Sequence, residues 1–155
     1  NENRTVPDYL ERGEWQAAPS VATLASAMDV GNPSNMERLR HLFPAWEAVR
    51  GAVTAYAVSD EEIRAQIRKD ADRFGQLWCP HTATAFRVFD TMRDEQRRAG
   101  PWVAVATAHP AKFETIVEPL VGRAVPVPPA LAALLERPTA AHSIAPELRA
   151  LAAHL

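Results

Sequence analysis

The sequence predicts an α/β fold in which helices alternate with short strands. Two apolar, β-branched runs, residues 53–58 and 102–106, have the composition of buried strands. Amphipathic helical patterns lie between them, and another follows the second run. Strand, helix, strand successions of this length are typical of right-handed βαβ crossovers. We therefore expect parallel-sheet βαβ units with flanking helices and a helical C-terminal tail.

Before the first of these runs, start and stop signals predict several short helices. Gly13 ends one helical pattern, Pro33 suits a first helical position, and Ser34 with Glu37 has the spacing of a capping box. The expected elements are a helix at residues 7–12, a helical turn or loop at 23–28, a helix from 33 to about 43, and a further turn or two at 45–50.

The middle of the chain carries the strongest helical patterns. Ser59 and Glu62 form a second capping-box pattern, and Ile63, Ile67 and Phe74 share one face of the helix that follows. The later expected helices are the longest one at residues 80–98, one at 111–121, and two short ones at 131–135 and 146–154. Glycine and proline signals divide the chain into residues 1–122 and a tail at 123–155, which we expect to pack on the first part.

Composition restricts the class of protein. The 155 residues are 47% hydrophobic and 23% charged, as in a soluble globular chain. The apolar runs are shorter than the roughly 20 residues of a membrane span, so we expect no membrane partner. A net charge of −2 argues against nucleic acid. Cys79 alone cannot form an internal disulfide, and we expect a cytoplasmic location.

The junction after residue 106 is the first candidate site. Thr107, His109 and Lys112 follow the second expected strand, at the edge where open parallel sheets bind their ligands. A hydroxyl, an imidazole and an ammonium group would meet there. The structural alternative is that Thr107 caps the helix, His109 bonds the loop backbone and Lys112 is solvated.

A second candidate lies at the expected helix start near residue 34. Ser34, Asn35 and Arg38 place a hydroxyl, an amide and a guanidinium where free backbone N–H groups attract anions. The alternative is a plain cap with a solvated arginine. Cys79 and His81 lack the further ligands that a zinc site needs, so we expect no metal.

Three motifs, in order, resemble the threonine synthase family. They are ASAMDVGNPSNMER at residues 25–38, PHTA at 80–83 and TAHPAKF at 107–113. The resemblance is strong from Asn1 to Phe113 and looser in the tail. Arg4 stands where the family usually has an aspartate, so this chain lacks that carboxylate.

The resemblance implies the C-terminal part of a fold-type-II enzyme that uses pyridoxal 5′-phosphate. The family converts O-phospho-L-homoserine and water to L-threonine and phosphate by γ-elimination and addition of water at Cβ. Thr107 would face the pyridine nitrogen of the cofactor. Ser34, Asn35 and Arg38 are then our hypothesis for the substrate phosphate, with His109 and Lys112 as further candidates.

The same resemblance places no catalytic residue in this segment. The Schiff-base lysine of the family lies upstream, and Lys112 is not that lysine. Because the chain begins at Asn1 and not at methionine, we expect a fragment that needs the missing N-terminal part of the same protein and is inactive alone. The alternatives are another fold-type-II lyase, such as a threonine dehydratase relative, and a non-catalytic α/β interaction module.

Overall fold

The computed structural model describes residues 1–154, which fall into two compact units. The first unit covers Asn1–Val125, and the second begins at Pro126. In the described part of the chain, no helix combines the length and apolar character needed to span a bilayer. The cytoplasmic location and the packing of the tail on the first part stay predictions.

The two runs that were expected to form strands are extended but unpaired. Within residues 1–154, no backbone hydrogen bond joins residues 53–58 or 102–106 to another extended segment. A strand needs such a neighbour for its N–H and C=O groups, and composition cannot supply one. Val103 and Val105 are 86% and 69% exposed, although the prediction placed them in the interior. The described chain is helical, and the predicted parallel sheet is not found in it.

Three helices near the N-terminus surround an apolar cluster. They are α1 (Thr5–Arg12), α2 (Met36–Leu42) and α3 (Trp46–Ala52). The buried side chains of the cluster are Tyr9, Leu10, Met36 and Val49. Gly13 ends α1 as predicted, at a φ of 78°, and its N–H donates to the Tyr9 carbonyl at 2.8 Å. Only glycine adopts this left-handed conformation without strain.

The capping box predicted at Ser34 does not form. The residue before α2 is Asn35, whose ψ of −13° is helical, and no side chain caps the first turn. A capping side chain reaches the third amide when the backbone at its own position is extended. Ser34 instead lies in the preceding turn, where its carbonyl accepts the N–H of Glu37 at 3.1 Å.

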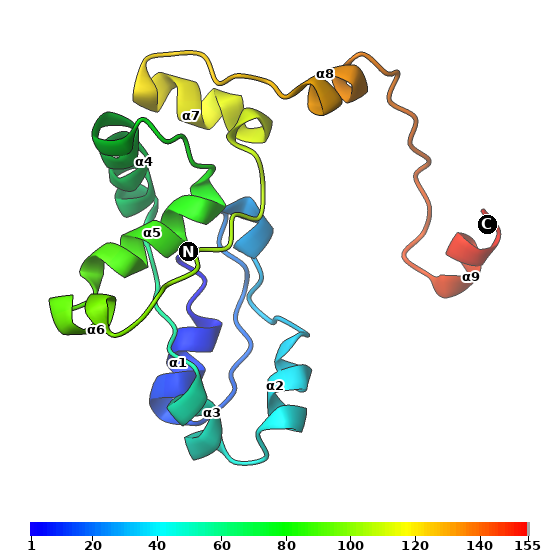
Figure 1. The fold of residues 1–155 in the computed structure, drawn as a ribbon. Coiled ribbons are helices and arrows are strands. Elements are labelled where there is room, and N and C mark those ends of the chain that lie inside the picture. The colour runs from blue at the N-terminus through cyan, green and yellow to red at the C-terminus, as the bar shows by residue number, and fades with distance from the viewer. Residues whose placement is uncertain (155) are drawn as a thin grey trace. The chain divides into compact units, whose positions relative to one another are not determined.

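Helices α4 (Asp60–Phe74) and α5 (Pro80–Thr91) lie side by side in the first unit (Figure 1). The capping box predicted for α4 forms, because Ser59 accepts the Glu62 N–H at 3.3 Å and the Glu62 carboxylate accepts the Ser59 N–H at 2.9 Å. Ile63 and Ile67 are fully buried. Phe74, which the pattern places on the same face, is 58% exposed at the helix end.

The single long helix predicted at residues 80–98 is two helices. After α5 ends at Thr91, Met92 and Arg93 are extended, with ψ of 146° and 149°, before α6 (Asp94–Arg98) begins. The side-chain carbonyl of Gln96 accepts the N–H of Arg93 at 3.2 Å, which caps the new helix. Consequently α4, with 15 residues, is longer than α5.

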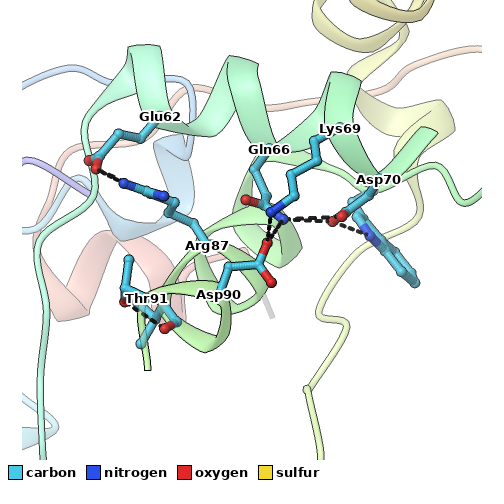
Figure 2. Close-up of polar contacts among 9 residues, drawn as sticks. Glu62, Gln66, Lys69, Asp70, Arg87, Asp90 and Thr91 are labelled. Carbon is cyan, nitrogen blue, oxygen red and sulfur yellow. Dashed lines mark hydrogen bonds and ion pairs between the residues drawn. The ribbon is translucent and has the colours of Figure 1, made fainter. Parts of the chain in front are cut away.

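A buried polar network joins α4 to α5 (Figure 2). The Gln66 amide donates to both carboxylate oxygens of Asp70 at 3.1 Å and to Asp90 at 2.9 Å. Lys69 forms an ion pair with Asp90 at 2.6 Å, and the Trp78 indole N–H donates to Asp70 at 3.1 Å. Gln66 and Asp70 are buried, so these donors replace water around the Asp70 carboxylate.

The last helices lie close to their predicted positions. The helix expected at residues 111–121 begins as a 3-10 turn, η2 (Pro110–Phe113), and continues as α7 (Glu114–Val121) up to Gly122. Helix α7 contacts α4. The second unit contains α8 (Pro129–Leu135) and α9 (Leu148–Ala152).

Candidate functional site

The junction at Thr107 leads from an extended segment into η2. Ala108 forms a bend and His109 is the residue before η2. The His109 Nδ1 accepts the N–H of Ala111 at 3.1 Å. His109 therefore caps the turn, which is the structural role that the sequence left open for it.

Thr107 does not cap the helix. Its side chain is exposed and makes no hydrogen bond within the described residues, because His109 already occupies the capping position. The hydroxyl of Thr107 is thus available both as a donor and as an acceptor. Lys112 is also exposed, and no ion pair of its ammonium group occurs in residues 1–154.

The loop before α2 is held by a hub of hydrogen bonds at Asp29. Its carboxylate accepts from the Asn1 amide at 2.6 Å, the Asn3 amide at 3.3 Å and the Thr23 hydroxyl at 2.7 Å. Asn1 and Asn3 are 28 and 26 positions from Asp29 in the sequence, and Thr23 is six. Neither helical nor strand periodicity marks such loop contacts, so the sequence did not indicate them.

Gly31 fixes the same loop at its other end. Its carbonyl accepts from the Thr5 hydroxyl at 2.8 Å and the Ala18 N–H at 3.0 Å, and its N–H donates to the Ser20 hydroxyl at 3.0 Å. A Cβ at this position would lie 1.9 Å from the Ala18 carbonyl oxygen. Only glycine fits, because the contacting atom belongs to the backbone.

The three predicted anion-binding residues follow this loop. Ser34, Asn35 and Arg38 are all exposed, and none makes a side-chain hydrogen bond or ion pair inside the described range 1–154. No such bond connects them directly with Thr107 or Lys112 either. Ser34 and Asn35 lie in the turn before α2 and Arg38 in α2 itself, whereas Thr107 precedes η2 and Lys112 lies in it.

His81 contacts a segment before the first group of candidates and the turn that contains Lys112. It lies in the first turn of α5 and is 5% exposed. Its Nε2 accepts the N–H of Ala27, in the 3-10 turn η1 (Ser26–Met28), at 2.9 Å. The centre of its ring is 5.0 Å from that of Phe113, the last residue of η2. In the sequence, His81 stood out only beside Cys79, where no metal site was expected.

Burial is the main influence on the titration of His81. It lowers the pKa of the imidazole below the ordinary value of 6.5, because the charged form loses water. The Asp29 carboxylate acts in the opposite direction, whereas Lys112 and the amino group of Asn1 add to the decrease in pKa. His81 is therefore neutral at pH 7.

Within the described residues, no three histidine, cysteine or acidic side chains gather as metal ligands do. Cys79 is buried, and its Sγ lies 3.3 Å from the Thr82 hydroxyl. The two residues that suggested a metal therefore have other partners, since His81 binds the backbone of η1.

Comparison with known proteins gives consistent matches. The family model described as "Threonine synthase, C-terminal" matches residues 82–155. Threonine synthase of Serratia marcescens is 38% identical over 146 residues, which are 93% of this chain and 33% of that protein.

Two solved structures are similar as well. The crystal structure of threonine synthase from Escherichia coli superposes with a TM-score of 0.77 at 32% identity, covering 97% of this chain and 34% of that one. The PLP-bound threonine synthase from Brucella melitensis gives a TM-score of 0.63 at 26% identity, covering 89% of this chain and 34% of that one. The chain spans about a third of the length of these proteins. By sequence and by fold, the chain is therefore similar to the threonine synthases, and its residues 82–155 match their C-terminal family model.

Proposed function

We propose that the protein containing this chain is a threonine synthase, converting O-phospho-L-homoserine and water to L-threonine and phosphate with pyridoxal 5′-phosphate. The similarity to the Serratia enzyme across 93% of the chain carries this proposal. The PLP-bound Brucella structure supports the cofactor. Residues 1–122 would be the C-terminal part of the catalytic domain, with residues 123–155 as its tail.

Thr107 is the residue that we assign to the cofactor. When bound, pyridoxal phosphate supplies the electron sink that lets phosphate leave Cγ and water add at Cβ. The exposed Thr107 hydroxyl, without a partner in the described residues, fits a hydrogen bond to the pyridine nitrogen. Being neutral, this hydroxyl does not hold a proton on the nitrogen as a carboxylate would.

The substrate phosphate is assigned to the segment after Gly31. The Arg38 guanidinium can bind a phosphate through two parallel hydrogen bonds, and the Ser34 hydroxyl and Asn35 amide can donate to further oxygens. All three side chains are exposed. His109 and Lys112, on the other loop, are the further candidates for the same anion.

The rest of the polypeptide would complete the site. Lys69 is engaged in the ion pair with Asp90, and Lys112 belongs to a motif that the family does not use to anchor its cofactor. We therefore expect the anchoring lysine outside this chain, and no activity from the chain alone. The exposed Val103 and Val105 fit a strand that pairs with a neighbour from that missing part.

The test uses the full-length protein with added pyridoxal phosphate. We expect release of phosphate from O-phospho-L-homoserine with formation of L-threonine in equal amount. Deamination of L-threonine to 2-oxobutyrate without phosphate release would favour a threonine dehydratase relative. Absence of cofactor binding and of both reactions would favour a non-catalytic module.

Two substitutions in that protein test the residue assignments. Thr107→Ala should shift the absorption spectrum of the bound cofactor and lower turnover, whereas Thr107→Ser keeps the hydroxyl and should retain both. An unaltered spectrum and rate in Thr107→Ala would remove Thr107 from the site.

Arg38→Ala should raise the KM for O-phospho-L-homoserine by about tenfold or more, the loss expected for a charge-assisted hydrogen bond. Arg40→Ala is the matched control, because Arg40 lies on the same helix but its guanidinium contacts the Trp15 ring at 5.3 Å. Equal KM values for the two variants would reject the assignment of Arg38.

A further inference from the structure

His81 has one satisfied and one unsatisfied ring nitrogen. Because Nε2 accepts the Ala27 N–H at 2.9 Å, Nε2 cannot itself carry a proton. A neutral imidazole then carries its proton on Nδ1. This Nδ1 is buried and has no hydrogen-bond partner in the described part of the chain, and it is the only such buried side-chain nitrogen or oxygen there.

The surroundings of His81 favour this neutral form. The residue lies in the first turn of α5, where the helix dipole disfavours a cation. Lys112 from η2 and the amino group of Asn1 are the positive groups near the ring, and Asp29 from the loop after η1 is the negative one. Burial removes the water that would solvate an imidazolium ion.

We propose that His81 is a positioning residue: as the neutral Nδ1–H tautomer, it holds η1 against the start of α5 through Nε2. It thereby fixes the loop that leads to Ser34 and to α2, which carries Arg38. Asp29 and Gly31 anchor the loop by their hydrogen bonds. The bond from Ala27 to His81 fixes where the preceding turn η1 lies relative to the first turn of α5. The ring contact with Phe113 relates this loop to η2.

Loss of the acceptor lone pair should release η1. Protonation at Nε2 replaces the acceptor by a donor, which faces the Ala27 N–H and cannot bind it. The loop would then move relative to η2, although the proposed substrate-binding side chains themselves are unaltered. This inference rests on the proposed function for its catalytic readout alone.

Two variants of His81 distinguish the role of the Nε2 acceptor from that of the imidazole ring. In His81→Gln the side-chain oxygen reaches the place of Nε2 and can accept from Ala27, whereas the shorter His81→Asn reaches only the place of Nδ1. In the full-length protein, hydrogen exchange of the Ala27 amide should be about tenfold faster in His81→Asn, the effect of losing one hydrogen bond. His81→Gln should keep the protection of the wild type.

Nuclear magnetic resonance of the ¹⁵N-labelled wild-type protein gives a test without any variant. We expect an unprotonated Nε2 and a protonated Nδ1 for His81 at pH 7. A protonated Nε2, or equal Ala27 exchange in wild type and a folded His81→Asn, would overturn the proposal. If His81→Asn does not fold, the tautomer measurement and the exchange of His81→Gln still decide it.

The catalytic readout is the KM for O-phospho-L-homoserine. It should rise several-fold in His81→Asn and stay near the wild-type value in His81→Gln, with kcat less affected. In the wild type it should also rise as the pH falls through the lowered pKa of His81, and this rise should be weaker in His81→Gln, in which only the substrate phosphate titrates. If the full-length protein never releases phosphate, the proposed function is refuted. The tautomer of His81 and the hydrogen exchange of the Ala27 amide still test the role of His81.

Discussion

Gly31→Ala is the substitution with the clearest expected cost. A Cβ at Gly31 would lie 1.9 Å from the carbonyl oxygen of Ala18, 2.8 Å from its carbonyl carbon and 3.0 Å from the carbonyl carbon of Pro19. These are backbone atoms and cannot rotate away as a side chain can. The segment at residues 17–20 must therefore separate from the loop.

The magnitude follows from the hydrogen bonds that this separation breaks. The Gly31 carbonyl loses the Ala18 N–H at 3.0 Å, and the Gly31 N–H loses the Ser20 hydroxyl at 3.0 Å. The bond from the Thr5 hydroxyl, at 2.8 Å, is strained as well. At about 1 kcal/mol net for each bond, Gly31→Ala should lower the free energy of unfolding by about 2–3 kcal/mol.

The assay is equilibrium unfolding in urea, followed by tryptophan fluorescence. The Trp15 indole donates to Asn32 at 3.2 Å, so one reporter lies next to the substituted residue. Gly51→Ala is the matched control, because beyond its chain neighbours and the backbone of its own helix nothing lies within 4 Å of the added Cβ, and Gly51 belongs to α3. There alanine should stabilise by about 0.5–1 kcal/mol. A Gly31→Ala midpoint equal to that of the wild type would refute the close approach at Ala18.

The remaining predictions concern α4. Gln66→Leu should lower the free energy of unfolding by about 1–3 kcal/mol, because the buried Asp70 carboxylate loses its amide donor. Urea unfolding measures this loss, and an unchanged midpoint would contradict the hydrogen-bond network. Ile67→Ala should lower the free energy of unfolding by about 2–5 kcal/mol, because Ile67 is fully buried. Phe74→Ala should lower it by less than about 1 kcal/mol, because Phe74 is exposed. Equal losses in the two variants would show that both side chains share one buried face. Bonds from the Ser59 N–H and Arg87 lower the pKa of Glu62 below its ordinary 4.5, so its stabilising effect is present above pH 4.5 and is lost as the pH falls. Glu62→Gln keeps an acceptor for the cap, and its acid unfolding should show a weaker dependence on pH in this range.

Local backbone signals were reliable where one residue and its near neighbours decide the conformation. Gly13, Gly75 and Gly122 each end a helix in the left-handed conformation. The Ser59 capping box formed because the backbone at Ser59 is extended. The same pattern failed at Ser34, since the residue before α2 is already helical.

Signals that depend on a distant partner were less reliable. Residues 53–58 and 102–106 have strand composition, but a strand requires a neighbour that the described chain does not supply. The break between α5 and α6 also escaped prediction, because the apolar stripe of Phe86, Phe89 and Met92 reaches it and no glycine or proline marks it in residues 81–98.

For the candidate site too, the sequence indicated residues that belong to local motifs but not those that act through distant partners. The sequence indicated Thr107 and Arg38 by motif, and the structure shows that both are exposed, while their roles stay proposals. It did not indicate that Asp29 and Gly31 anchor the loop before Arg38. Their partners come from the first residues of the chain and from residues 17–23.

The sequence by itself determined where most helices lie, their glycine ends and the resemblance to threonine synthases, because these depend on short-range pattern and on motifs. Only the tertiary structure decided that Thr107 is free of a capping role and that His81 joins η1 to α5. The first outcome depends on which of two nearby side chains accepts the Ala111 amide, and the second on a contact between residues that are 54 positions apart in the sequence. Periodicity carries no information about such competition for hydrogen bonds.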